Sequence, residues 1–161
     1  MGRKKTNRDT AYVATWNVPY QTGALKAIGY GQGKELGSAE LRSAGPVARV
    51  KLKPDRTTLF ADGQDLSYIT VDLVDANEVR NPNAENLVKF AVTGPGEIIA
   101  VANANPMSVE SYQRPQRKAW QGRCLVIIKA RKEPGQIRLT ASTAGLSSAK
   151  GVITASSAVS H

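Results

Sequence analysis

The sequence has little of the residues on which several common kinds of active site depend. Among its 161 residues there is one cysteine, Cys124, and one histidine, His161. A single cysteine excludes an internal disulfide framework and a zinc site built from several cysteines. A single histidine at the terminus argues against a histidine-based triad or metal cluster. We therefore predict no metal site and no cofactor.

Long apolar runs are also missing. No uninterrupted apolar stretch approaches the roughly 18 residues that a membrane-spanning helix needs. The basic residues 1–5 are followed by the polar segment 6–9 and not by the apolar region of a signal peptide. We predict that the chain has no membrane partner.

Basic residues outnumber acidic ones, with 22 Lys and Arg against 13 Asp and Glu. The excess is divided among residues 1–8, the segment 114–123 and alternate positions of apparent strands. Charged side chains at such positions commonly keep a sheet soluble, and net charge informs non-specific association and not fold. No zinc-finger spacing, helix-turn-helix pattern or aromatic RNA-binding motif accompanies the charge. We therefore favour a solvated surface over a polyanion site and predict no nucleic-acid partner.

Apolar and polar residues alternate with a period of two along most of the chain. This pattern is typical of strands with one face on a core and the other in water. The apolar run 125–128 predicts a central strand covered on both faces, and a short helical turn is an alternative over residues 84–90. The predicted one-faced strands cover residues 47–53, 69–73, 88–92 and 137–141, and further strand candidates cover residues 11–16, 24–30, 35–42, 97–102 and 149–155.

Turn signals separate these strands and suggest two units. Glycine supplies positive φ and proline pre-sets the turn in segments such as 62–63, 94–96 and 133–135, and short strands at this spacing predict a β-sandwich. A boundary is predicted at 43–46, after a small unit of about three strands that buries only one face and needs something to pack on. The predicted core of this small unit consists of Trp16, Tyr20, Leu25, Ile28, Tyr30 and Leu41.

Two stretches resemble one known family. Residues 15–30, TWNVPYQTGALKAIGY, followed by Gly33-Lys34-Glu35, resemble a segment of bacterial glycoside hydrolase family 2 β-galactosidases. In those enzymes this segment lies in an immunoglobulin-like domain downstream of the catalytic barrel. Residues 55–71, with DRTTL and ADGQDLS, and shorter segments as far as Gly122 are similar to their final domain. The resemblance implies an all-β chain: a truncated end of an immunoglobulin-like domain at 1–45, and a C-terminal immunoglobulin-like β-sandwich at 46–161.

The resemblance also implies what this chain does not carry. Family members have a sugar-binding jelly-roll domain, a first sandwich domain and a (β/α)₈ barrel before this region. The barrel supplies the acid/base and nucleophile glutamates, which retaining hydrolysis needs about 5 Å apart. We therefore predict no catalytic residue here, and a chain that is inactive alone with a structural or accessory role. The parent would hydrolyse terminal β-D-galactosides by a retaining mechanism, in the periplasm or after secretion.

The partners implied are the remaining domains of that parent enzyme. Gly2-Arg3-Lys4 matches the end of a strand-turn in the family, so we expect the chain to begin inside a domain whose opening strands are missing. A strand edge left unpaired in this way can pair with a second copy of the chain. An adhesin-like spacer module is a weaker alternative, because the region around Asp62-Gly63 also resembles bacterial immunoglobulin-like repeats.

The segment 103–122 is the one region where we predict a binding site. It contains Asn105, Tyr112, Arg117 and Trp120. Aromatic faces stack on the C–H faces of sugar rings, while amides and guanidinium groups hydrogen-bond the hydroxyls. A carbohydrate-binding module that uses this loop is therefore the alternative function, with carbohydrate as partner. The simpler interpretation is that Trp120 fills the sandwich core and that the charges are solvated.

Other candidate residues have structural interpretations. Asp62 and Asp65 flank a turn and are expected to cap backbone N–H groups. The alternative is a calcium site with Asp72 or Asp75, but no loop supplies the roughly six to eight oxygens that calcium takes. Cys124 begins the apolar run, so we predict that it is buried and inert.

Overall fold

The structure of the chain, a computed structural model, describes residues 1–157. These residues fall into two compact units, which divide between Ser43 and Ala44. All of their regular elements are strands, and none of the described elements is a helix that could cross a membrane. The alternative of a helical turn over 84–90 is wrong, because residues 87–93 form strand β6.

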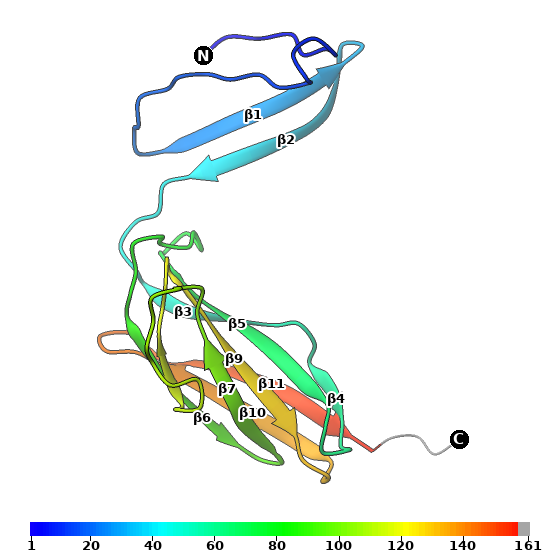
Figure 1. The fold of residues 1–161 in the computed structure, drawn as a ribbon, viewed down its shortest axis with the longest axis vertical. Coiled ribbons are helices and arrows are strands. Elements are labelled where there is room, and N and C mark those ends of the chain that lie inside the picture. Colours follow the sequence, from blue (N-terminus) through cyan, green and yellow to red (C-terminus); the bar gives the residue numbers. More distant parts are fainter. Residues whose placement is uncertain (158–161) are drawn as a thin grey trace. The chain divides into compact units, whose positions relative to one another are not determined.

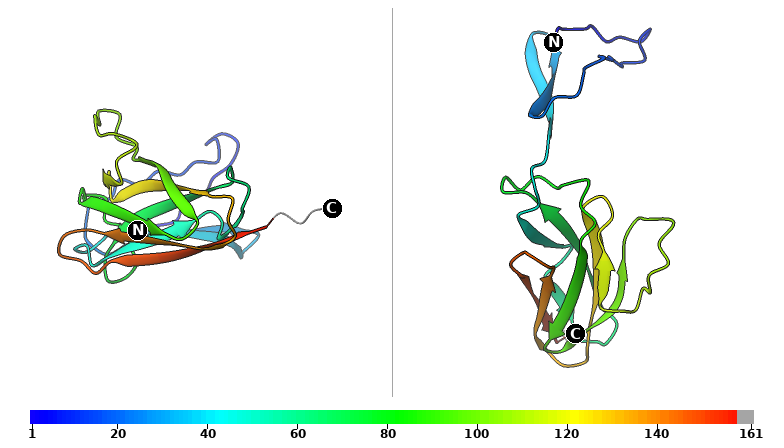
Figure 2. Two further views of the ribbon diagram at one scale, coloured as in Figure 1. Left: turned by 90° about the horizontal axis from the view of Figure 1, so that it is seen from below. Right: turned by 90° about the vertical axis from the view of Figure 1, so that its left-hand side faces the viewer.

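The second unit is a sandwich of two sheets, so the predicted all-β sandwich is confirmed. In Figure 2, β10 and β11 (orange to red) lie in one layer, with β5 and β9 in the other. Neighbouring strands run antiparallel except β4 and β11. The five-stranded sheet contains, in order, β4 (Thr58–Phe60), β11 (Ala149–Ser156), β10 (Gly135–Ser142), β6 (Leu87–Thr93) and β8 (Gln116–Lys118). The four-stranded sheet contains β3 (Arg49–Pro54), β5 (Leu66–Val74), β9 (Arg123–Ala130) and β7 (Gly96–Ala102).

The core lies between the two sheets and follows the period-two pattern. On β9, Cys124, Val126 and Ile128 are buried, whereas Leu125 and Ile127 point to the other face and are only partly buried. β9 lies between β5 and β7, so the predicted central position is right. The predicted cover on both faces is wrong within the described part of this unit, because a sandwich has only two layers and the outer face of each has no third layer above it.

The first unit contains one described hairpin, made of β1 (Ala24–Gly31) and β2 (Lys34–Arg42). The prediction of about three strands is wrong, because residues 11–16 are not a strand. Asn7 and Thr10 hydrogen-bond each other's backbone N–H groups through their side chains. Ala11 and Tyr12 follow with φ of 49° and 59°. Left-handed backbone of this kind interrupts an extended strand.

One face of this hairpin is wholly apolar. Leu25 pairs with Leu41, Ala27 pairs with Ala39, and a glycine pair, 29 with 37, follows on the same face. We call these residues the hairpin face; the opposite face is mixed, with the charged pair Lys26 and Glu40 and the pair Ile28 and Ser38. The six residues predicted as the core of this unit are between 38% and 82% exposed, so that prediction is wrong for the described chain. A two-stranded hairpin has no second layer that could bury them.

Candidate functional site

Trp120 is placed by a tight turn immediately before β9. Its N–H donates to the carbonyl of Arg123 at 2.8 Å, and the N–H of Arg123 donates back at 3.0 Å. Between them, Gln121 and Gly122 have φ of 49° and 74°. Positive φ at both central residues is the type I′ hairpin turn, whose twist matches that of the flanking strands. The turn therefore fixes the backbone of Trp120, from which the indole projects.

A cleft of about 570 Å³ opens beside Trp120, on the outer face of the four-stranded sheet. Its floor consists of Thr70, Leu125 and Ala102, which are cross-strand neighbours on β5, β9 and β7. This volume is within the usual range of small-molecule sites, about 300–1,000 Å³. None of the described residues that line the cleft is an Asp or a Glu. The polar and aromatic side chains around it are those of Arg80, Asn103, Trp120, Gln121 and Arg123.

The two arginines of the cleft differ in their surroundings. Arg123 binds the buried carboxylate of Asp72 through Nε at 2.6 Å and Nη2 at 3.1 Å, and Lys53 reaches the same carboxylate at 3.1 Å. Burial raises the pKa of Asp72, but the hydrogen bonds and charges of Arg123 and Lys53 outweigh it and hold that pKa below its ordinary value. Arg80 is exposed, and the ion pairs of the described residues include none with it. Arg123 and Lys53 thus share one carboxylate, so the charge of Arg123 is compensated in part, whereas that of Arg80 faces solvent.

Arg117, one of the predicted site residues, lies on β8 and is fully buried. Its Nη1 donates to the carbonyl of Glu110 at 2.9 Å and its Nη2 to Oδ1 of Asn103 at 3.1 Å. The guanidinium carbon lies 4.7 Å from the centre of the Tyr112 ring, a cation–π distance. Arg117 therefore holds the loop together and does not line the cleft.

Asn103 connects this network to the cleft. Its Oδ1 also accepts from the N–H of Asn105 at 3.2 Å, and its Nδ2 donates to the carbonyl of Lys118 at 2.8 Å. The structure thus separates the predicted residues into two groups. Trp120 lines the cleft, whereas Tyr112, Arg117 and Asn105 belong to the network of contacts that holds Asn103 and do not line the cleft. Trp120 is also not a member of the buried core, so the simpler interpretation of that residue is wrong.

Sequence reasoning missed Thr70, Arg80 and Arg123 as neighbours of Trp120. Thr70 and Arg80 are distant along the chain and reach the cleft through the pairing of β5 with β9 and a bridge between Val74 and Arg80. Alternation alone places Thr70 on an outward face. No sequence signal identifies Arg80.

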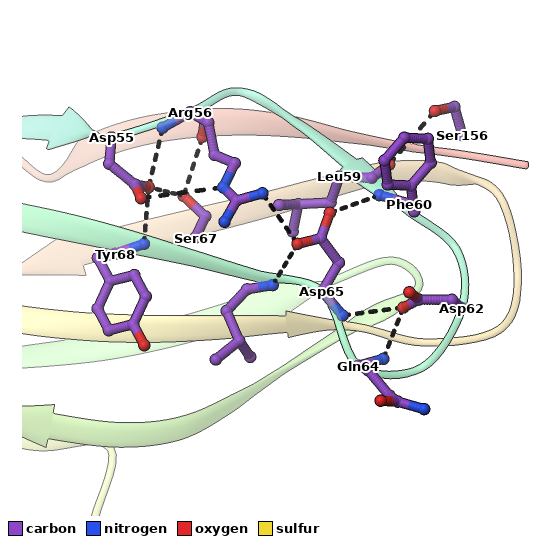
Figure 3. Close-up of polar contacts among 11 residues, drawn as sticks. Asp55, Arg56, Leu59, Phe60, Asp62, Gln64, Asp65, Ser67, Tyr68 and Ser156 are labelled. Carbon is purple, nitrogen blue, oxygen red and sulfur yellow. Dashed lines mark hydrogen bonds and ion pairs between the residues drawn. The ribbon is translucent and has the colours of Figure 1, made fainter. Parts of the chain in front are cut away.

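The acidic residues around β4 cap and tie together its loops. Oδ1 of Asp62 accepts from the backbone N–H groups of Gln64 at 2.7 Å and Asp65 at 2.9 Å, which confirms the capping prediction (Figure 3). These bonds lower the pKa of Asp62. Asp65 in turn accepts from the N–H groups of Phe60 and Leu66, at 2.8 and 3.0 Å.

Asp55 and Asp65 lie on either side of the Arg56 guanidinium, as Figure 3 shows. Asp55 also accepts from the hydroxyl of Ser67 and the N–H of Tyr68. The two carboxylates thus face a cation and backbone donors, an arrangement that stabilises loops and does not flank a substrate. Within the described residues, no group of three His, Cys, Asp or Glu side chains is placed to hold a metal ion.

The other acids weighed for calcium have partners of their own. Asp72 is bound by Arg123, and Asp75 accepts backbone hydrogen bonds from Gly45 and from the turn that follows it. Cys124 is buried as predicted, and desolvation raises the pKa of its thiol to about 12. A thiol with such a pKa is not a nucleophile at neutral pH.

Comparison with known proteins gives consistent matches. The family described as glycoside hydrolase family 2 C-terminal domain 5 matches residues 50–152, and a domain of unknown function, DUF4982, matches residues 1–37. Beta-galactosidase BoGH2A of Bacteroides ovatus is 41% identical over 145 residues, which are 90% of this chain and 17% of that protein. A beta-galactosidase of Thermoanaerobacter pseudethanolicus is 32% identical over 124 residues, which are 77% of this chain and 15% of that one.

Among solved structures, a glycosyl hydrolase family 2 member from Bacteroides cellulosilyticus superposes with a TM-score of 0.92 at 44% identity. The match covers 96% of this chain and 20% of that protein. The chain therefore spans about a fifth or less of the length of these relatives.

Proposed function

The chain belongs to the glycoside hydrolase family 2 C-terminal domain 5 family, and from this membership we propose that it is a non-catalytic, accessory part of a β-galactosidase. The family expected from the sequence and the all-β, immunoglobulin-like sandwich class are both confirmed. We infer the accessory role and the reaction of the parent enzyme from similarity and from chemistry.

The observation that carries the proposal is the contrast in coverage. Similarity extends over 90% to 96% of this chain but over only 17% to 20% of the relatives. Two relatives are named beta-galactosidases as whole proteins, so we assign the hydrolysis of terminal β-D-galactosides to a whole parent enzyme. A retaining mechanism there needs two carboxyl groups about 5 Å apart across the scissile bond. The described residues that line the cleft of this chain include no carboxylate. Secretion or a periplasmic site of action stays a prediction.

The hairpin face supports a structural role. Leu25 and Leu41, at 41% and 72% exposure, lie opposite each other on a face without polar side chains. Removing apolar surface from water is favourable by a free energy of roughly 25 cal/mol per Å², so covering this face with another apolar layer is stabilising. We infer that the remaining domains of the parent enzyme are that layer. A second copy of the chain is the alternative occupant.

Three measurements test the accessory role. The purified chain should show no turnover of an aryl β-galactoside, and activity that copurifies with it would refute the proposal. Exchanging the matching segment of the Bacteroides ovatus β-galactosidase for this chain should preserve hydrolysis, whereas deleting that segment should lower thermal stability. A deletion variant as stable and active as the intact enzyme would contradict the accessory role.

Light scattering of the isolated chain separates a monomer from a dimer completed by a second copy.

A second candidate function is carbohydrate binding. The observation in its favour is that Trp120 and Asn103 both line a cleft of about 570 Å³. Titration of the chain with galactose, followed by calorimetry, tests it directly. Saturable heat that disappears when Trp120 is replaced by alanine, with the circular dichroism spectrum unchanged, supports it.

A further inference from the structure

We propose that the cleft beside Trp120 binds a sugar ring that carries an anionic group, a carboxylate or a sulfate, and that Arg80 recognises the charge. This inference rests on the second candidate function and names the class of sugar. It follows from the shape of the cleft, from its hydrogen-bonding groups and from its charge.

The shape suits a flat ring with one apolar face. Leu125 and Ala102 give the floor an apolar surface, and Trp120 is held at its side by the type I′ turn. Aromatic side chains offer sugars a rigid surface for their C–H faces at low cost in conformational entropy. The backbone of Trp120 is held by the hydrogen bonds of the turn, so its position does not depend on the side chains of the loop.

The cleft also keeps donors for hydroxyl groups. A side-chain amide has two N–H donors and a carbonyl oxygen with two acceptor positions. In Asn103 the carbonyl oxygen already accepts from Arg117 and Asn105, and one amide hydrogen serves the carbonyl of Lys118. The second amide hydrogen remains for a ligand. Gln121 and Thr70 add polar groups at the rim and the floor.

The charge of the cleft then depends on Arg80. The bidentate pair with Asp72 uses the Nε and Nη2 groups of Arg123, and no described carboxylate lines the cleft. Arg80 is exposed beside this space. A guanidinium fork matches the geometry of carboxylate and sulfate oxygens, which it binds through two parallel hydrogen bonds. A neutral sugar leaves this group unused, so an anionic sugar should bind more tightly.

The experiment compares three ligands on the full chain: galactose, galacturonate and galactose 6-sulfate. Replacing Trp16 by phenylalanine leaves Trp120 as the one tryptophan, since the sequence has two, and calorimetry gives a second readout. Because an exposed ion pair contributes up to about 1 kcal/mol, we expect an anionic sugar to bind about threefold to fivefold more tightly than galactose at low salt. Carboxylate and sulfate are distinguished by which of the two anionic sugars shows the preference.

Two variants decide whether Arg80 is responsible. Arg80→Gln should remove the preference and leave galactose binding unchanged. The matched control is Arg138→Gln, an exposed arginine on β10 in the opposite sheet, which should keep the preference. Raising the ionic strength should weaken the preference, because the pair is exposed.

The outcomes separate this inference from the function on which it rests. Equal binding of galactose and both anionic sugars would overturn the anionic class and leave sugar binding standing. Absence of any saturable response, in fluorescence and in heat, at tens of millimolar would overturn both. A preference that persists in Arg80→Gln would refute the role of that arginine.

Discussion

Replacing Gly122 by alanine should destabilise the second unit strongly, because two separate costs add at this position. The first is conformational: φ is 74°, in the left-handed region that residues with a Cβ adopt at a cost of about 1–2 kcal/mol. The second is steric. A Cβ would lie 2.1 Å from the carbonyl oxygen of Asn81, which is backbone and cannot rotate away. The N–H of Asn81 is bonded to the carbonyl of Leu73 on β5 at 2.9 Å, so this contact has little freedom to relax.

The chain contains a matched control for the steric part. Gly145 has φ of 78°, but a Cβ there would meet nothing within 4 Å. The conformational cost of Gly145→Ala is partly offset by the lower entropy of the unfolded chain, worth about 0.4–1 kcal/mol. Overpacking adds about 1–3 kcal/mol when a group is forced into filled space. We therefore expect Gly145→Ala to lose about 1 kcal/mol and Gly122→Ala about 2 kcal/mol more than that.

Urea unfolding of both variants, followed by the fluorescence of Trp120, measures the difference in free energy of unfolding. In a domain of this size each 1 kcal/mol corresponds to about 4 °C in Tm, so calorimetry provides an independent check. Gly122→Ala should also change the native fluorescence of Trp120, since the turn places that side chain. Equal losses in the two variants would refute the argument that the Asn81 carbonyl restricts this position.

Three further predictions concern buried polar groups. Arg117→Met keeps the aliphatic length but loses two charged hydrogen bonds and an aromatic stack, so the free energy of unfolding should fall by about 2 kcal/mol in urea titrations; unchanged stability would contradict the network described above. The pKa of Asp72 is lowered in the folded chain, so its contribution to stability is complete above its ordinary pKa of 3.8 and is lost as the pH falls through the lower, folded value. As the pH falls from about 5 to about 2, the Asp72→Asn variant should therefore lose less free energy of unfolding than the unchanged chain. Parallel plots of unfolding free energy against pH for the two proteins would argue against this pairing. Cys124 should not react with a thiol reagent at about pH 8 until the chain unfolds, and rapid labelling of the native chain would show that the site opens.

The fold was largely predictable, because a strand with one buried face alternates apolar and polar residues along the sequence. Residues 69–73 and 137–141 alternate strictly and form the middle of β5 and β10. The segment 11–16 is also a strand candidate but forms no strand. Its outcome depends on left-handed backbone at Ala11 and Tyr12, and residues with a Cβ give no signal of positive φ.

The candidate site was predictable only in part. An aromatic side chain in a segment with amide and guanidinium groups identified Trp120, but its neighbours in the cleft come from strands that only the folded pairing brings together. Arg117 has the opposite difficulty. It lies in a basic segment that suggests a solvated surface, yet it is fully buried. A backbone carbonyl and an amide oxygen accept from its two terminal nitrogens, whereas its Nε has no hydrogen-bond partner among the described residues and lies 3.8 Å from Oε2 of Glu110. Composition does not distinguish these two environments.

The two errors about burial concern surfaces that the chain by itself leaves without full cover. The sequence pattern predicts that Leu25 and Leu41 are core residues and that the run 125–128 is covered on both faces. In the chain by itself, the two leucines are exposed and the outer side of β9 is only partly buried. The outer side of β9 also carries Arg123 and Lys129, whereas the hairpin face is wholly apolar, as expected of a sheet face that packs against another layer. The other face of the hairpin is mixed, with the charged pair Lys26 and Glu40 beside the pair Ile28 and Ser38. The apolar pattern of the hairpin face without cover is therefore an argument, independent of sequence similarity, for the proposal that another part of a larger protein packs on this face.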